Sequence, residues 1–449
     1  MLCLRPFNAG LWPFASHRVL EHRTRRTSFV PFPGWGTVAV GPLGVWAAKS
    51  VWKSRSRAQA SESLRSQGTR YQRRLKKAER KRSLVAEPAR RCPPLTAPDC
   101  SEYEADLQRK VTFVEQLLAE PFTRDAVDME VIRSPELLHY RHRLRFELRH
   151  AEDESIQYVV FDPDSNAWIP VNSYPIASKR INQLMLDLQV ALSEEQKLRW
   201  KAFQVELLSN TVGEALALIM YHRRLDDGDA KRAQNLSKRV DANIVLRARG
   251  QRLAFPARRS FLIQENEVAG KLYPQRLLES SFFQANLKLN QLMQSWLLQE
   301  LGDSSSRDLL EIYCGNGNFT LPAASIFRQV LATEVDGNSL AAAKACAKEA
   351  KIENLQVKKC RAEDMDFQQL CDLGYDFSTL LLDPPRAGLS DRAREMSSRF
   401  DRVIYISCNP QTLVRDLSRM ESLRIQGACL FDQFPWTEHA EVALNLVKT

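Results

Sequence analysis

Residues 100 to about 265 have a hydrophobic pattern that predicts one helix followed by several strands. Ser101 and Glu104 have the spacing of a capping box, and apolar residues recur at helical intervals from Leu107 onward. The stretch RHRLRFELRH has a period of two, which predicts a strand with one apolar and one charged face. Further strands are predicted at IQYVVF, EALALIMYHRR and ANIVLRARG, between turn signals such as DPDSN and LDDGD. We therefore expect an α+β region here.

A different pattern begins after about residue 270. A helix is predicted from Gln284, and short apolar runs then alternate with helical stretches. The predicted strands are DLLEIY, QVLATEV, NLQVKKC, FSTLLLD and RVIYIS. Alternation of strand and helix predicts an α/β domain with a parallel, doubly wound sheet.

The positive charge of the chain is concentrated at its N-terminus. The formal net charge is +10, but residues 1–91 hold 20 of the 64 Lys and Arg and only 4 of the 54 Asp and Glu. That segment carries +16, and the other 44 basic and 50 acidic residues leave −6, so whole-chain charge is no argument for nucleic-acid binding. The stretch HRVLEHRTRRTSF is rich in Arg, Ser and Thr, which is typical of a mitochondrial presequence. The basic run at 71–83 fits a solvated or cleaved tail better than an RNA contact.

Two further features limit the class of protein. Residues 29–48 are uncharged, but three prolines and four glycines argue against a membrane-spanning helix there. The nine cysteines contain no C-x-x-C pair and form no cluster with histidine. This pattern argues against a metal site or a disulfide framework and indicates a reducing compartment.

Two glycines follow the first predicted strand of the C-terminal half, in EIYCGNGNFTL. Gly315 and Gly317 let the backbone pass close to a ligand, and the helix that follows offers its N-terminus. The next strand ends in Glu334, 17 residues beyond Gly317, where a carboxylate can accept hydrogen bonds from ribose hydroxyls. These features fit NAD, FAD and S-adenosylmethionine alike.

Two later strands end in residues with more distinctive chemistry. Asp383 is followed by two prolines in LLLDPPRAGL, a rigid loop typical of methyltransferases that act on planar nitrogens and bases. The next strand delivers Cys408 in YISCNP, at the end of the sheet where α/β proteins bind ligands. On these residues alone, a packing role and a nucleophilic role are both open for this thiol.

Six motifs in order carry a resemblance to a known family: SSFFQAN, LEIYCGNGNFTL, LATEVDG, LLDPPRAGL, YISCNPQTLVRDL and FDQFPWTEHAE. Over residues 100–449 the chain resembles the TrmA-type RNA uracil-5-methyltransferases, and most of all their mitochondrial branch. The resemblance implies a class I (Rossmann-like) methyltransferase domain at 269–449, an α+β RNA-recognition domain at 96–268, and a presequence with a basic linker at 1–95. It implies S-adenosylmethionine as the cofactor, contacted by Gln284, Tyr313, Asn318, Glu334 and Asp383, with Cys408 as the nucleophile and Glu441 as the general base.

The implied reaction is methylation of uridine C5, at the T-loop uridine of tRNA position 54, with ribosomal RNA as a further candidate substrate. A thiolate that adds to C6 makes C5 nucleophilic, and a carboxylate must then remove the C5 proton. The charged strand face offers three candidates for phosphate contacts, Arg141, Arg143 and Arg149. In one departure from the bacterial pattern, Glu438 stands in place of a histidine, and we expect it to raise the pKa of Glu441 or to alter substrate contacts.

Two other functions stay open. A methyltransferase acting on a base nitrogen would need Asp383 and its prolines but not Cys408, and an RNA-binding or folding factor of this fold would need no turnover. We expect a monomer in the mitochondrial matrix, with tRNA as its partner, no metal and no membrane span.

Overall fold

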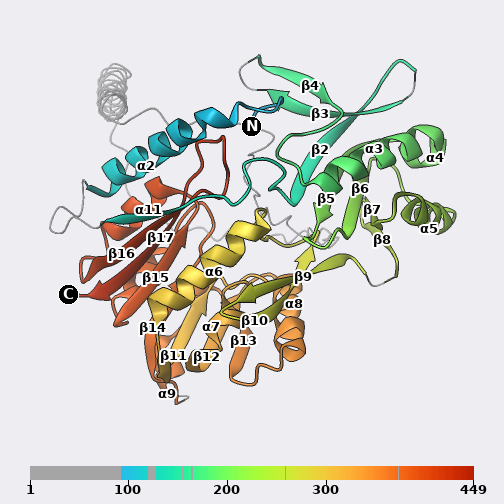
Figure 1. Cartoon of the computed structure of the whole chain (residues 1–449). Coiled ribbons are helices and arrows are strands. Elements are labelled where there is room, and N and C mark those ends of the chain that lie inside the picture. The colour runs from blue at the N-terminus through green and yellow to red at the C-terminus, as the bar shows by residue number, and fades with distance from the viewer. Residues whose placement is uncertain (1–92, 120–127, 154, 163–164, 258, 373) are drawn as a thin grey trace, which may run out of the picture. The chain divides into compact units, whose positions relative to one another are not determined.

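The computed structural model describes residues 93–119, 128–153, 155–162, 165–257, 259–372 and 374–449. The predicted presequence, the uncharged stretch and the basic run lie outside these residues (Figure 1). Strands in the described part of the chain form a seven-stranded sheet, an eight-stranded sheet and a two-stranded hairpin.

The seven-stranded sheet has the α+β character expected from the sequence. In spatial order it contains β4 (Ala167–Val171), β3 (Ile156–Asp162), β2 (Arg143–His150), β5 (Ala202–Ser209), β6 (Ala215–Tyr221), β7 (Asn243–Ala248) and β8 (Gln251–Phe255). Neighbouring strands are antiparallel except β6 and β7, which α5 (Asp229–Val240) connects. Alternate residues of β2 are buried on the side of α3 (Lys179–Glu194), which a short helix α4 (Gln196–Arg199) joins to β5.

The eight-stranded sheet is parallel except at β17, which is antiparallel to both of its neighbours. Its spatial order is β1 (Met129–Ile132), β16 (Leu423–Phe431), β17 (Glu441–Lys448), β15 (Arg402–Ser407), β14 (Phe377–Leu382), β11 (Ser304–Ile312), β12 (Phe327–Glu334) and β13 (Leu355–Lys359). Helical elements connect the strands: α6 (Leu287–Leu301), α7 (Thr320–Ala323), α8 (Gly337–Glu349), η2 (Ala362–Asp364), α9 (Phe367–Asp372), α10 (Asp391–Ser397) and α11 (Pro410–Leu417).

Both faces of this sheet are covered by helices, as a doubly wound sheet requires. Leu381 packs with α6 on one face, whereas Leu380 and Leu382 pack on the other face with α10 and α11. Successive residues of a strand point to opposite faces, so β14 contributes to both layers.

The N-terminal helix and the first strand belong to the C-terminal sheet, although both lie in the range 96–268 that was expected to form the RNA-recognition domain. The turn η1 (Cys100–Glu102) leads into α2 (Tyr103–Ala119), and its cap is Asp99 rather than the expected Ser101. Helix α2 packs against α11, and β1 pairs in parallel with β16. Local periodicity predicts a helix but not the distant sheet that buries it.

The two sheets are joined by the hairpin of β9 (Phe261–Val268) and β10 (Lys271–Leu278), and the expected boundary falls in its turn. Leu262 and Leu277 pack with the seven-stranded sheet, whereas Val268 and Tyr273 pack with residues of the C-terminal half. In the part of the chain that the structure describes, no helix is both long enough and apolar enough to cross a membrane.

Candidate active site

Cys408 lies between the end of β15 and the start of α11, at the edge of the eight-stranded sheet where its parallel strands end. Asn409 caps the helix, because its side-chain oxygen accepts a hydrogen bond from the backbone N–H of Gln411 at 3.2 Å. The Asn409 side chain also donates to the carbonyl of Arg386 at 3.2 Å, which joins this turn to the Asp-Pro-Pro loop. Strand, cap and loop together place the thiol at the sheet edge.

Strand register brings three of the predicted residues together at this edge. Ser407 is paired with Val442 in the antiparallel ladder of β15 and β17, so the register continues to Cys408 opposite Glu441. Asp383 directly follows β14, the parallel neighbour of β15. The predicted nucleophile, base and acidic loop residue therefore meet, although they are far apart in the sequence.

Burial raises the pKa values of the three acidic groups in this cluster, and neighbouring carboxylates add to the effect at Cys408 and Glu441. Burial raises the pKa of the Cys408 thiol well above its ordinary value, and Glu441 and Asp383 add to the effect, while Arg386 opposes it. Burial and Asp383 raise the pKa of Glu441 well above its usual range, and burial raises the pKa of Asp383 to about 7. The carboxylate that raises the pKa of Glu441 is thus Asp383, and not Glu438 as we expected from the sequence.

Arg386 and His439 complete the cluster. His439 stands two residues ahead of Glu441, as the bacterial pattern leads one to expect, whereas Arg386 had not been singled out from the sequence. Arg386 Nη2 lies 2.9 Å from His439 Nδ1. Because arginine can only donate, Nδ1 is the acceptor and the proton of the neutral ring sits on Nε2. Burial and then the cations Arg386, Lys110 and Arg141 lower the pKa of His439 to about 3, so the ring is neutral. The position of Arg386 directly after the two prolines was the signal that could have revealed it.

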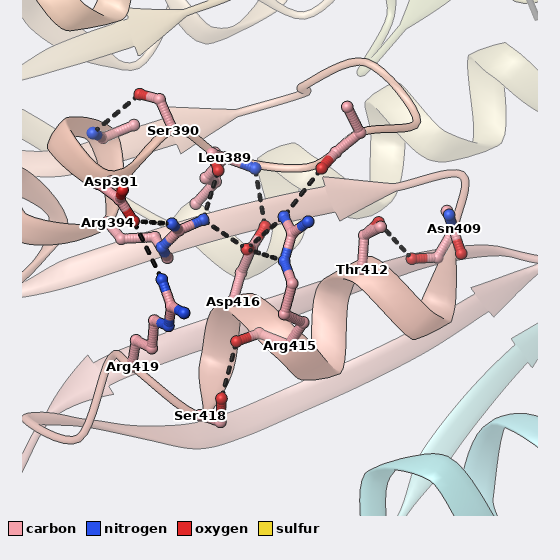
Figure 2. Close-up of polar contacts among 12 residues, drawn as sticks. Leu389, Ser390, Asp391, Arg394, Asn409, Thr412, Arg415, Asp416, Ser418 and Arg419 are labelled. Carbon is pink, nitrogen blue, oxygen red and sulfur yellow. Dashed lines mark hydrogen bonds and ion pairs between the residues drawn. The ribbon is translucent and has the colours of Figure 1, made fainter. Parts of the chain in front are cut away.

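A buried carboxylate, Asp416, ties the Asp-Pro-Pro loop to the strand that carries Cys408. It accepts hydrogen bonds from the backbone N–H of Leu389 at 2.7 Å, from Arg394 Nη1 at 2.8 Å and from the Tyr405 hydroxyl at 2.8 Å. Figure 2 shows Asp416, on the helix that follows Cys408, with its contacts to Leu389, Arg394 and Arg415. Gly388 has a φ of +77°, and a Cβ there would collide with the Asp416 carboxylate.

The predicted cofactor residues surround the glycine loop after β11. Glu334 ends β12, and its carboxylate accepts hydrogen bonds from the backbone N–H groups of Gly315, Val335 and Asp336 at 3.0, 2.7 and 2.8 Å. Tyr313, half-buried at the end of β11, has a φ of +69°. A Cβ built on Gly315 would meet no atom within 4 Å, so a ligand can approach the backbone here. This geometry fits a nucleoside cofactor held by Tyr313, Glu334 and Asp383.

Two other predicted cofactor residues have protein partners. Asn318 accepts hydrogen bonds from Gln275 at 3.0 Å and Asn290 at 2.8 Å, and its own amide donates to Asn290 at 2.8 Å. Gln284 is buried, and its carbonyl accepts a hydrogen bond from Gln433 at 2.7 Å. Asn318 therefore supports the glycine loop through its side chain, and direct contacts of both residues with the cofactor stay predictions.

The three arginines proposed for RNA lie in different surroundings. Arg143 is mostly buried and donates to Glu206 at 2.5 Å and to the carbonyl of Ser281 at 2.5 Å, so it ties β2 to the segment before α6. The Arg141 guanidinium lies 5.3 Å from the ring of Phe434, in the loop that leads to Glu441. Arg149 is exposed, and its guanidinium lies 5.3 Å from the ring centre of Trp168. Arg143 is thus poorly placed for a phosphate, whereas Arg149 is accessible.

Comparison with known proteins places the chain in a family. Its residues 102–449 match the model of the tRNA (Uracil-5-)-methyltransferase family. The tRNA/tmRNA (uracil-C(5))-methyltransferase of Pseudomonas putida (strain W619) is 40% identical over 363 residues, which are 78% of this chain and 98% of the relative. The corresponding protein of Stutzerimonas stutzeri (strain A1501) is 38% identical over 368 residues, 79% of this chain and 99% of the relative.

A solved structure supports the same assignment at the level of the fold. The Pyrococcus abyssi tRNA (uracil-54, C5)-methyltransferase, in complex with S-adenosyl-L-homocysteine, has a TM-score of 0.59 and 18% identity, and the match covers 81% of this chain and 92% of that one. The fold is therefore that of a class I methyltransferase, as expected. The chain belongs to the tRNA (uracil-5-)-methyltransferase family, which confirms the TrmA-type resemblance.

Proposed function

We propose that the protein methylates C5 of the T-loop uridine at position 54 of mitochondrial tRNA, through a covalent bond between Cys408 and uracil C6. The observation that carries this proposal is the ladder of β15 and β17, whose last pair is Ser407 with Val442, so that Cys408 and Glu441 are the next residues of the two segments at the carboxyl edge of the sheet. A nucleophile and a base on neighbouring strands can act on adjacent carbons of one ring.

Each residue of the cluster has a part in this chemistry. Arg386 favours the thiolate of Cys408 against the effects of burial and the two carboxylates. Addition of the thiolate to C6 places negative charge on C5 and O4, and S-adenosylmethionine, when bound, supplies the methyl group. Glu441 then takes the C5 proton, the C–H electrons form the C5–C6 double bond, and the bond from C6 to sulfur breaks to release the thiolate.

This arrangement favours C5 methylation over the two alternatives from the sequence. A base-nitrogen methyltransferase has no need of a thiol paired with a carboxylate on the neighbouring strand. Glu441 is buried, and its surroundings raise its pKa. A protein that only binds RNA has no need of such a carboxylate, whereas a general base does.

A surface on the seven-stranded sheet supports RNA as the partner. The rings of Phe203 and His222 are stacked with centroids 3.9 Å apart, and His222 also lines a pocket of about 580 Å³ with Arg224 and Arg249. Aromatic rings beside arginines suit the bases and phosphates of RNA. Arg149 lies on the same sheet and is our remaining candidate for a phosphate contact.

Two finer parts of the proposal have support of their own. We propose position 54 because the Pyrococcus abyssi enzyme of similar fold is a tRNA (uracil-54, C5)-methyltransferase. The mitochondrial location follows from the Arg-rich, acid-poor N-terminus. Residues 1–95 fused to a fluorescent protein should direct it to the mitochondrial matrix, and a cytosolic signal would reject the location.

The activity can be tested with mitochondrial tRNA transcripts that carry tritium at uridine C5. Methylation should release one tritium per tRNA into water, whereas a transcript with cytidine at position 54 and the variant Cys408→Ala should release none. Release from the cytidine transcript would reject position 54. Release from a ribosomal RNA fragment at a similar rate would add that RNA as a substrate.

A further inference from the structure

A buried charged network connects the N-terminal helix to the loop that precedes Glu441. Lys110 and Asp432 are 2% and 1% exposed, and Lys110 Nζ lies 2.5 Å from Asp432 Oδ1. The Tyr103 hydroxyl donates to the other oxygen of Asp432 at 2.8 Å, and Lys110 Nζ also donates to the carbonyl of Phe434 at 3.1 Å. We call Tyr103, Lys110 and Asp432 the α2 clamp.

The loop at 432–440 is also fixed at several other points by residues near β1. Asp432 N–H donates to the carbonyl of Ile132 at 3.0 Å. The Trp436 indole donates to the carbonyl of Leu137 at 2.8 Å, and the Tyr140 hydroxyl donates to the carbonyl of Pro435 at 3.1 Å. The Trp436 ring packs edge-on against Tyr103, with centroids 5.7 Å apart. Residues 432–436 of the loop are thus held by α2 and by the segment 132–140, while the other end of the loop carries His439 and leads into Glu441.

Stability alone does not explain the α2 clamp, because burial of its charged groups costs free energy. A lysine and an aspartate removed from water lose their hydration, and well-packed apolar residues at such sites are often as stabilising. Unlike apolar packing, an ion pair fixes one defined geometry, because its hydrogen bonds are directional. In the described structure this geometry is imposed at the start of the loop at 432–440, which leads into Glu441.

We propose that the α2 clamp positions the loop at 432–440 so that Glu441 can remove the C5 proton, and that Tyr103, Lys110 and Asp432 are positioning residues for this step. The proposal rests on the covalent mechanism proposed above. Glu441 acts only after the methyl group has been transferred, so a loosened clamp slows the last step and leaves addition of Cys408 intact. RNA then stays bonded to the protein through C6 and sulfur.

The test uses the full chain, ordinary tRNA and S-adenosylmethionine labelled in the methyl group. Tyr103→Phe removes one hydrogen bond to Asp432 and keeps the ring packed on Trp436. The matched control is Tyr158→Phe, which removes one buried hydroxyl on β3 that donates to the carbonyl of Met185 in α3 at 2.9 Å. Label that remains with denatured protein and RNA measures the unresolved adduct, and single-turnover rates separate methyl transfer from product release.

For Tyr103→Phe we expect unchanged methyl transfer in the first turnover, product release slowed by about tenfold, and labelled adduct that accumulates with ordinary tRNA. Tyr158→Phe should accumulate none. Lys110→Met should give a larger effect if it folds, and Tyr103→Phe decides the question if it does not. Equal slowing in both tyrosine variants without adduct would overturn the proposal. If wild type forms no adduct even with RNA carrying 5-fluorouridine, the covalent mechanism fails first, and the role of the clamp with it.

Discussion

Asp416 offers a strong test of how the active-site loops are held together (Figure 2). Its carboxylate is fully buried and accepts hydrogen bonds from Leu389, Arg394 and Tyr405, in addition to Arg415 of its own helix. In Asp416→Asn, the charge is lost and one acceptor oxygen becomes an NH₂ group that faces donors. The buried guanidinium of Arg394 then keeps only the exposed carboxylate of Asp391 as a charged partner.

The size of the effect follows from these contacts. Hydrogen bonds to charged groups contribute about 1.5–3 kcal/mol each, and removal of one partner of a buried ion pair costs about 3–5 kcal/mol. We therefore expect Asp416→Asn to lower the free energy of unfolding by about 3–5 kcal/mol, a large part of the usual total of about 5–15 kcal/mol. The same change should slow adduct formation, since Leu389 belongs to the loop after Asp383 and Tyr405 to the strand before Cys408.

Urea denaturation followed by tryptophan fluorescence measures the loss. The matched control is Asp391→Asn, because Asp391 pairs with the same Arg394 but is 87% exposed. Exposed ion pairs contribute about 0–1 kcal/mol, so the control should change the midpoint little. If Asp416→Asn costs no more than Asp391→Asn, the reasoning about this network is wrong.

Three further outcomes are expected. Gly388→Ala should lower the melting temperature measurably, because the added Cβ meets Asp416 at a φ of +77°, and an unchanged melting temperature would contradict this. Adduct formation should rise with pH from 6.5 to 9, since the pKa of Cys408 is raised and the thiolate is the reactive form; a fall over that range would reject the thiolate step. Burial lowers the pKa of His142 to about 4. As pH falls, His142 is therefore protonated in the unfolded chain at a higher pH than in the folded protein. Stability should therefore decline between pH 6.5 and 4, and His142→Gln should make the decline shallower in urea titrations.

The elements and the centre of the site were predictable because they depend on local patterns. The apolar runs before Asp383 and Cys408 predicted buried strands, and residues at the ends of parallel strands meet at one sheet edge. The pairing of Cys408 with Glu441 needed the family resemblance, since nothing local says that β17 inserts between β15 and β16. Arg386 stood in a motif already identified but was not singled out.

What the sequence did not predict depends on contacts between distant segments. Arg143 was expected at a phosphate, but it is mostly buried against Glu206 and the segment before α6. Lys110 is instructive because it lies three residues after Leu107 and one before Val111, on the apolar side of its helix. A lysine on that side indicates a buried partner, but Asp432 lies over 300 residues away, and only the folded chain identifies it.

The most direct test of the central claim uses the full chain, S-adenosylmethionine and tRNA carrying 5-fluorouridine at position 54. Fluorine at C5 cannot leave as a proton, so Glu441 cannot complete the reaction and the bond between Cys408 and C6 should persist through denaturation. We predict a protein–RNA adduct with wild type, mapped to Cys408 by mass spectrometry, and none with Cys408→Ala. Binding of cofactor and RNA without any adduct in wild type would contradict the covalent mechanism.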